Sequence, residues 1–202
     1  MEKNILTTPL TEQQVRALKL GDIVYLKGRI YTARDMAHLR IRETLRDGKP
    51  LPHDFNGATL LHAGPVALQR EDGTWELKAV GPTSSIRMEP YADMVGQMGI
   101  RAVIGKGGME DGTVAACQKY GYVYLQGCPG CAAMHAKGIN AIVGVDWIDL
   151  GVTEAMWDFD AECFGPLIVS IDAHGNSIYR DVIAEGQKRL DAMYPPVGKE
   201  SV

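Results

Sequence analysis

The chain has 202 residues, of which 46% are hydrophobic and 23% are charged, a composition typical of a globular protein. Its formal net charge of −4 argues against a nucleic-acid or membrane-surface role, because both need a basic face. No apolar run approaches the roughly 20 residues of a membrane span, and the polar N-terminus does not resemble a signal peptide.

The first half of the chain is predicted to be rich in strands, which we expect over residues 22–26, 29–32, 59–62 and 75–80. Lys27-Gly28 separates the first two strands and predicts a hairpin between them. Apolar side chains that recur every four residues predict a helix over residues 35–46, ended by Gly48. A second helix is expected over residues 91–98.

The second half alternates short apolar strands with helices. Strands are expected over residues 101–105, 122–125, 141–145 and 167–171. Helices are expected over residues 113–119, from about residue 131, and over residues 177–193. This alternation predicts an α/β fold in which helices cover a sheet. We expect one domain over residues 1–195 and a disordered tail over residues 196–202.

Three cationic side chains lie at the ends of predicted strands or the starts of predicted helices. Arg34 precedes the first long helix, where the helix dipole disfavours a cation unless an anion is bound. Arg87 follows three hydroxyl residues, 83–85, and Lys106 lies among glycines between a strand and a helix. Because ligand crevices form at such ends of a sheet, these residues predict a site for a small dianion or trianion.

Each of these segments also has a plainer interpretation. The segment around Lys106 fits neither a Walker phosphate loop nor a dinucleotide-binding fingerprint, and a solvated lysine in a flexible turn would bind nothing. The three hydroxyls at 83–85 are typical of a helix cap. Asp35 and His38 share one helix face and can hydrogen-bond to each other or to Arg34.

Cys128 and Cys131 have the spacing of a thiol-redox pair or of half a zinc site. His135 is a candidate third zinc ligand, whereas Cys117 and Cys163 are isolated in the sequence. Without a secretion signal, we expect all four cysteines to be reduced thiols in the cytoplasm, as small buried or helix-capping side chains, and no metal site in this chain.

A set of segments, taken in order, resembles the β subunit, or C-terminal domain, of class I iron–sulfur fumarases and of L-tartrate dehydratase. The segments are residues 7–9, 21–26, 32–38, 62–65, 81–88, 105–109 and 164–176. Each segment is weak alone, but together and in this order they are specific, and they extend over nearly the whole chain.

The resemblance implies a swivelling β/β/α domain with mixed sheets packed with helices. It also implies an α subunit that holds a [4Fe–4S] cluster through three cysteines, with one iron open to act as a Lewis acid on the substrate. The expected assembly is an α2β2 heteromer in the cytoplasm, or a homodimer when the chain is isolated. No metal ligand is expected in this chain.

The resemblance also assigns roles to residues of this chain. Thr83 matches the catalytic threonine, which removes or returns the proton on the carbon next to a substrate carboxylate. The residues expected to bind substrate are Arg34, Ser84, Arg87 and Lys106. Asp35 and His38 are expected to orient Arg34 or to support the site from behind. Neighbouring cations would stabilise the alkoxide of Thr83 and the charge that develops on the substrate carboxylate.

The activity implied is the reversible hydration of fumarate to L-malate by a hydro-lyase that works only with its partner subunit. Dehydration of L(+)-tartrate to oxaloacetate is the alternative, because both families share every segment above. A stand-alone dicarboxylate-binding protein or a thiol-redox protein is an alternative of another class. Cys128 and Cys131 lie where the family usually has glycine and alanine, so the resemblance leaves this pair unexplained.

Overall fold

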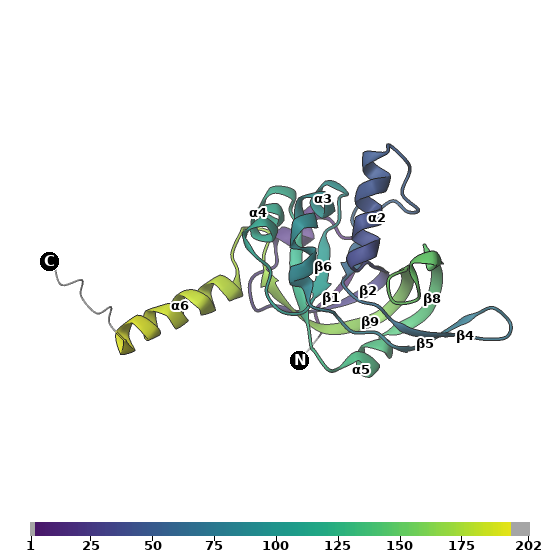
Figure 1. Cartoon of the computed structure of the whole chain (residues 1–202). Coiled ribbons are helices and arrows are strands. Elements are labelled where there is room, and N and C mark those ends of the chain that lie inside the picture. Colours follow the sequence, from purple (N-terminus) through teal and green to yellow (C-terminus); the bar gives the residue numbers. More distant parts are fainter. Residues whose placement is uncertain (1–2, 195–202) are drawn as a thin grey trace.

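The computed structural model describes residues 3–194 and confirms the predicted α/β class (Figure 1). The strands are β1 (Ile5–Thr7), β2 (Ile23–Thr32), β3 (Thr59–Leu61), β4 (Val66–Gln69), β5 (Trp75–Ala79), β6 (Ala102–Gly105), β7 (Val123–Gly127), β8 (Ile139–Asp146) and β9 (Met156–Ile171). The α-helices are α1 (Glu12–Arg16), α2 (Asp35–Arg46), α3 (Ala92–Gln97), α4 (Asp111–Tyr120), α5 (Ala132–Ala136) and α6 (Ile178–Met193). Two 3-10 helices are η1 (Ser85–Tyr91) and η2 (Ile148–Leu150). The expected tail over residues 196–202 lies outside the described residues.

The main sheet combines a parallel part and an antiparallel part. Strands β1, β2, β3, β6 and β7 are neighbours in that order and run parallel. Strand β9 runs antiparallel to β7, to β8 and to β2. Because β9 is hydrogen-bonded to both β7 and β2, the sheet closes on itself and its two parts face each other. Strands β4 and β5 form a separate hairpin.

Alternate side chains of the parallel strands enter two different cores. Leu61, Ile104 and Leu125 pack in the core between the two parts of the sheet, together with Trp157 and Phe159 of β9. Their chain neighbours Leu60, Val103 and Tyr124 pack in a second core with residues of α2, α3 and α4. This period of two produces three layers, which are antiparallel strands, parallel strands and helices. Figure 1 shows α2, α3 and α4 on one side of the parallel strands, with β8 and β9 on the other.

The hairpin expected at Lys27-Gly28 is wrong, because β2 continues through these residues as one ten-residue strand. Gly28 has a φ of 97° and lies beside a shift in the register between β2 and β9. A Cβ atom there would lie 2.6 Å from Oγ1 of Thr8. Glycine therefore permits an irregularity within the strand, which a sequence pattern does not distinguish from a hairpin turn.

Several elements were missed or shortened in the sequence analysis. Strands β1 and β4 and helix α1 were not expected, and only residues 167–171 of β9 were expected. Gly165-Pro166 lies inside β9 at a position that normally ends a strand. The helix expected over residues 91–98 is α3, which covers residues 92–97. Residues 85–91 before it form the 3-10 helix η1, which was not expected.

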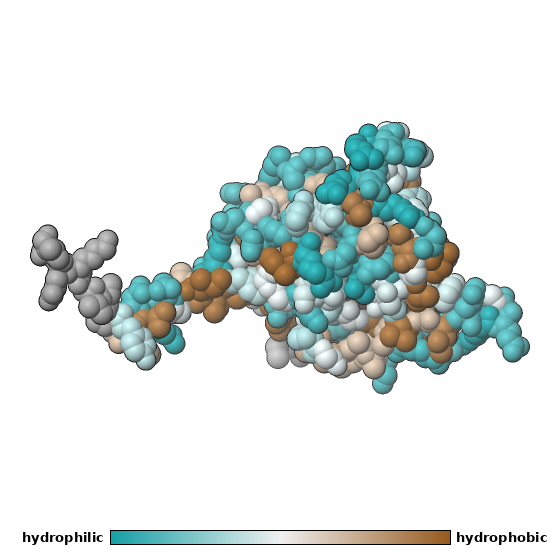
Figure 2. Space-filling view, viewed as in Figure 1, coloured by the Kyte–Doolittle hydropathy of each residue, from teal (hydrophilic) through white to brown (hydrophobic). Residues whose placement is uncertain are grey.

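Helix α6 confirms the expected C-terminal helix and leaves the body of the molecule (Figure 1). None of its residues is buried, and its most exposed apolar side chains are Val182, Ile183, Leu190 and Met193. Figure 2 shows hydrophobic side chains where α6 meets the body. Over residues 3–194, no helix is long and apolar enough to cross a membrane.

Candidate functional site

The carboxyl ends of the parallel strands bring the candidate residues to one edge of the sheet. Arg34 follows β2, His62 follows β3, Lys106 follows β6 and Cys128 follows β7, and these four strands are neighbours in that order. Such an edge is where ligands bind in parallel sheets. The segment with Thr83 joins this edge, because its backbone N–H donates to the carbonyl of His62 at 2.7 Å.

Ser85, which the sequence analysis did not select as a site residue, ties the Thr83 segment to β6. Its buried Oγ accepts a hydrogen bond from the backbone N–H of Lys106 at 3.2 Å and lies 2.9 Å from Nδ1 of His62. Its backbone N–H donates to the carbonyl of Lys106 at 3.1 Å. A Cβ atom at Gly105 would lie 1.8 Å from this Oγ, so only glycine leaves room for it. The sequence signal was a third hydroxyl in a row, which was interpreted as part of a cap.

Arg87 connects the candidate catalytic hydroxyl to a carboxylate. Its Nη2 donates to Oγ1 of Thr83 at 3.2 Å, because the chain turns into η1 between the two residues. Its Nε and Nη2 also donate to the two carboxylate oxygens of Asp35, at 2.8 and 3.0 Å. The Arg87 guanidinium holds the pKa of Asp35 below its usual range, and the carboxylate raises the pKa of Arg87. Asp35 therefore orients Arg87, whereas the sequence predicted that it orients Arg34 or supports the site from behind.

Arg34 is the N-cap residue of α2 and pairs with Glu154, which the sequence analysis missed. Its Nη2 lies 3.1 Å from Oε1 of Glu154, and Oε2 of the same carboxylate accepts a hydrogen bond from the Met36 N–H at 3.1 Å. Glu154 thus supplies the negative charge that the N-terminus of α2 favours and offsets the unfavourable cation. The Nε of Arg34 is buried and has no hydrogen-bond partner among the described residues.

His38 and His62 lie behind the site as neutral side chains. Their ring centroids are 5.2 Å apart and both are fully buried. Burial lowers the pKa of His38 to about 4 and the pKa of His62 well below its usual range. Nδ1 of His38 lies 2.9 Å from the carbonyl of Arg34, which can only accept, so Nδ1 carries the proton. This contact places the His38 ring against the backbone of Arg34.

Lys106 and Ser84 line an open hollow of about 640 Å³. The two residues are joined by a parallel β-bridge, and Gln126 and Pro129 complete the far side of the hollow. Over residues 3–194 the ammonium of Lys106 has no carboxylate partner, in contrast to the guanidinium groups of Arg34 and Arg87. The hollow is large enough for a small dicarboxylate and presents a cation to it.

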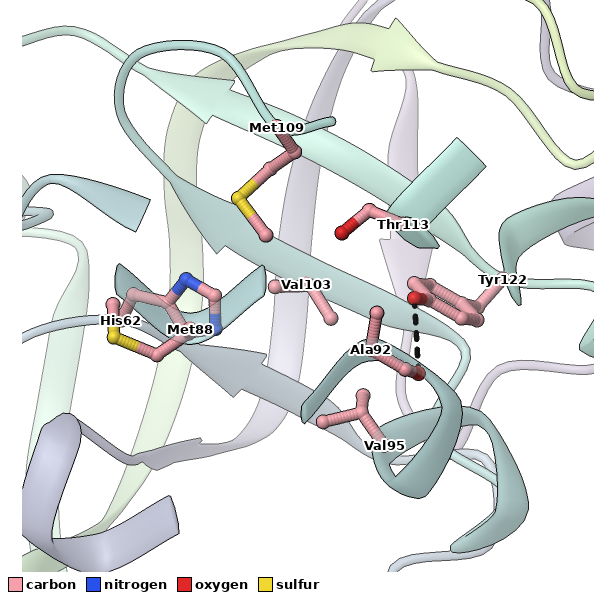
Figure 3. A pocket seen from close by; sticks show the side chains of 8 residues that line it. All are labelled: His62, Met88, Ala92, Val95, Val103, Met109, Thr113 and Tyr122. Atoms are coloured by element: carbon pink, nitrogen blue, oxygen red, sulfur yellow. Dashed lines mark hydrogen bonds between the residues drawn. The ribbon is translucent and has the colours of Figure 1, made fainter. Parts of the chain in front are cut away.

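A second, much smaller cavity lies behind the site and is shown in Figure 3. Its volume is about 10 Å³, which is the space of about one water molecule. The lining residues are His62, Met88, Ala92, Val95, Val103, Met109, Thr113 and Tyr122. The hydroxyl of Tyr122 donates to the carbonyl of Ala92 at 3.3 Å. A cavity of this size and lining belongs to the core and does not accept a substrate.

The cysteines of the described residues do not fit an iron–sulfur cluster. Over residues 3–194, no group of three or more His, Cys, Asp or Glu side chains is placed to hold a metal ion. The Sγ atoms of Cys128 and Cys131 lie 3.4 Å apart, but Cys117 is buried in the second core and Cys163 lies near Lys3. His135, the candidate third zinc ligand, packs its ring against Phe164 with centroids 5.2 Å apart.

The chain is similar over most of its length to proteins of one known family. The model of the family described as "Fumarase C-terminus" matches residues 2–182. The chain belongs to this family. It is 40% identical over 199 residues to the L(+)-tartrate dehydratase subunit beta of Escherichia coli (strain K12), covering 98% of this chain and 95% of that one. The resemblance inferred from the sequence segments is therefore confirmed.

A second relative in the fumarase C-terminus family is much longer. The chain is 42% identical over 199 residues to the "Putative fumarate hydratase class I" of Geobacillus stearothermophilus. The match covers 97% of this chain but 38% of that protein. Members of the family thus occur both as a separate subunit and within a longer chain.

Proposed function

We propose that this chain is the β subunit of a hydro-lyase that interconverts fumarate and L-malate. The observation that carries the proposal is the Arg87 guanidinium, which contacts both the Asp35 carboxylate and Oγ1 of Thr83 beside the hollow at Lys106. A cation held in this orientation stabilises the alkoxide form of a threonine, which is otherwise a poor base.

The proposed chemistry assigns one task to each group. Lys106 and Arg34 bind the two substrate carboxylates, and Ser84 adds a hydrogen bond beside Lys106. In the hydration direction, the Thr83 hydroxyl gives its proton to the carbon next to a carboxylate, and the N–H of Arg87 stabilises the alkoxide that remains. In the dehydration direction, the alkoxide takes the proton back from the same carbon.

A partner subunit completes the proposed enzyme. We infer that an α subunit holds the [4Fe–4S] cluster, which would supply a Lewis acid for the substrate hydroxyl. The name of one relative of similar length, a subunit beta, supports this division. The proposal includes an α2β2 assembly in the cytoplasm, with residues 1–195 as one domain.

L(+)-tartrate is the second candidate substrate. The relative named tartrate dehydratase subunit beta matches this chain over nearly its whole length, whereas the fumarate hydratase relative is a longer single chain. L-malate and L(+)-tartrate are both four-carbon dicarboxylates, and each loses a proton from a carbon next to a carboxylate when it is dehydrated. The same residues therefore serve both substrates.

Anaerobic co-expression with a candidate α subunit tests the proposal. The purified pair is assayed with fumarate, L-malate and both tartrate enantiomers, and the chain alone is assayed in parallel. We expect turnover of one substrate pair by the complex and none by the chain alone. A pair that binds its cluster but converts none of the four compounds would refute the proposed function, and robust turnover by the isolated chain would refute the division of tasks.

A further inference from the structure

Cys128 and Cys131 lie at the candidate site, although the proposed function gives them no role. Cys128 directly follows β7, and β7 is the neighbour of β6, which ends beside Lys106. Pro129, between the two cysteines, lines the same hollow as Ser84 and Lys106. The two thiols therefore belong to the ligand edge of the parallel strands and not to a remote surface.

The local geometry brings the two thiols together. The Sγ atoms are 3.4 Å apart, and the thiol of Cys131 donates toward the sulfur of Cys128. Gly130 has a φ of 81°, a conformation that glycine adopts without strain and that turns the chain between the two cysteines. Cys128 is exposed and Cys131 is half-buried, so a reagent in solution reaches Cys128 first.

The other two cysteines differ in accessibility and surroundings. Cys117 is fully buried in the second core, and burial raises the pKa of its thiol. Cys163 is half-buried like Cys131, but it lies on β9, whereas the pair lies between β7 and α5, and its Sγ is 3.5 Å from Nζ of Lys3. Since reaction needs an accessible thiolate and a second thiol within reach, the structure favours Cys128 and Cys131 for oxidation.

The segment with the two thiols packs tightly on the segment that leads to Thr83. The backbone N–H of Val80 donates to the carbonyl of Ala132 at 3.1 Å, and a Cβ atom at Gly81 would lie 2.9 Å from Cβ of Ala132. A Cβ atom at Gly127 would lie 3.1 Å from Cγ of Pro82. Because no space separates the two segments, a conformational change over residues 127–132 reaches Pro82 and the adjacent Thr83.

We propose that Cys128 and Cys131 form a reversible oxidation site, and that closing their disulfide shifts the segment that carries Thr83 and so changes the activity. The oxidant class is a low-molecular-weight disulfide. The thiolate of Cys128 attacks one sulfur of that disulfide and releases one small thiol. The thiolate of Cys131 then attacks Sγ of Cys128 in the mixed disulfide and releases the second. One S–S bond breaks and one forms, two electrons pass to the oxidant, and the two protein protons end on the released thiols.

The first test measures the mass of the full chain after incubation with glutathione disulfide. We expect a loss of two hydrogen atoms, a Cys128–Cys131 link in the peptide map, and full reversal by dithiothreitol. C128S should abolish the loss, whereas C131S should instead accumulate the mixed disulfide at Cys128. C163S is the matched control and should behave like the natural chain. A link that involves Cys163, or a loss that persists in C131S, would overturn the proposal.

The second test measures hydrogen exchange in the peptide that contains residues 80–87, in the reduced and the oxidised full chain. We expect a change in its exchange rate that C128S does not show, because C128S forms neither the mixed disulfide nor the internal one. Unchanged exchange with the disulfide formed would overturn the link to Thr83. This readout does not depend on activity, so it decides the proposal even if the proposed function fails.

A third measurement connects the site to turnover and rests on the proposed function. The β chain is oxidised alone, freed of oxidant and then combined anaerobically with the α subunit, so that the cluster never meets the oxidant. We expect kcat at least about two-fold lower than for the reduced chain, restored by dithiothreitol, and no change when C128S is treated in the same way. Equal kcat of both forms would refute the effect on activity. An inactive pair in the reduced state would instead refute the proposed function.

Discussion

Replacing Arg87 by methionine removes both its charge pair with Asp35 and its contact with Thr83, and the two losses are expected to affect different quantities. The guanidinium donates twice to Asp35, at 2.8 and 3.0 Å, and once to Oγ1 of Thr83, at 3.2 Å. The side chains of Arg87 and Asp35 are 41% and 39% exposed, so solvent screens the pair and its loss costs about 0–1 kcal/mol of folding stability. For a chain of this length that is a shift in Tm of a few degrees at most.

The contact with Thr83 has a larger expected effect on the reaction. Removing one donor from a group that becomes negatively charged typically costs about 2.7–4 kcal/mol of transition-state stabilisation, or roughly 10²–10³ in kcat. We therefore expect Arg87→Met to lose about two to three orders of magnitude in kcat of the reconstituted pair, while the full chain unfolds at nearly the natural temperature. Steady-state kinetics and thermal unfolding measure the two quantities separately.

Arg40 offers a matched control. It lies on α2, its Nη1 donates to both carboxylate oxygens of Asp149 at 2.8 and 2.7 Å, and its side chain is 33% exposed. Arg40→Met removes a charge pair of the same type without touching Thr83. If both variants lose kcat equally, or if Arg87→Met stays within about three-fold of the natural pair, the assignment of Arg87 to the alkoxide of Thr83 is wrong.

Three further results are expected. Thr83→Val should remove most of kcat with little change in unfolding temperature, and near-normal kcat would contradict its role in proton transfer. Asp35→Asn removes a carboxylate whose pKa Arg87 holds below its usual value. Such a carboxylate stabilises the fold above its unfolded-state pKa, and this stabilisation is lost as the pH falls. The natural chain should therefore lose stability below about pH 4 more steeply than the variant, which denaturant titrations at several pH values measure. Gly105→Ala places a Cβ atom 1.8 Å from a buried hydroxyl and should cost about 1–3 kcal/mol, whereas Gly144→Ala, with nothing within 4 Å, should cost less; equal losses would refute the packing argument.

Local signals in the sequence select the cationic residues of the candidate site, whose roles stay predictions. Arg34, Arg87 and Lys106 each lie next to a turn or a helix start, and the structure brings Thr83 and Arg87 into contact as their spacing on one turn allows. The family segments added the expected role of Thr83, which residue type alone does not indicate and which stays a prediction.

Long-range partners were beyond the reach of local patterns. Glu154 lies in the loop before β9, far along the chain from Arg34, and nothing in its neighbourhood distinguishes it from a solvated acid. Ser85 was hidden in a run of hydroxyls because its role depends on Gly105 of another strand. The length of β9 was underestimated because Gly165-Pro166 looks like a strand end unless the antiparallel partner is known.

Strand β9, which closes the sheet, also determines how late in synthesis the fold around the candidate site can form. Strand β9 is synthesised after every other strand of the main sheet, yet it pairs with β2, and the ion pair of Arg29 with Asp158 joins residues 129 positions apart. Such distant pairings are formed slowly, and a nascent chain that stops before β9 leaves the edges of β2 and β7 open. Arg34 obtains its partner Glu154 in the same late stretch of synthesis. The pair of Arg34 with Glu154 therefore forms only in chains whose synthesis has reached the residues just before β9.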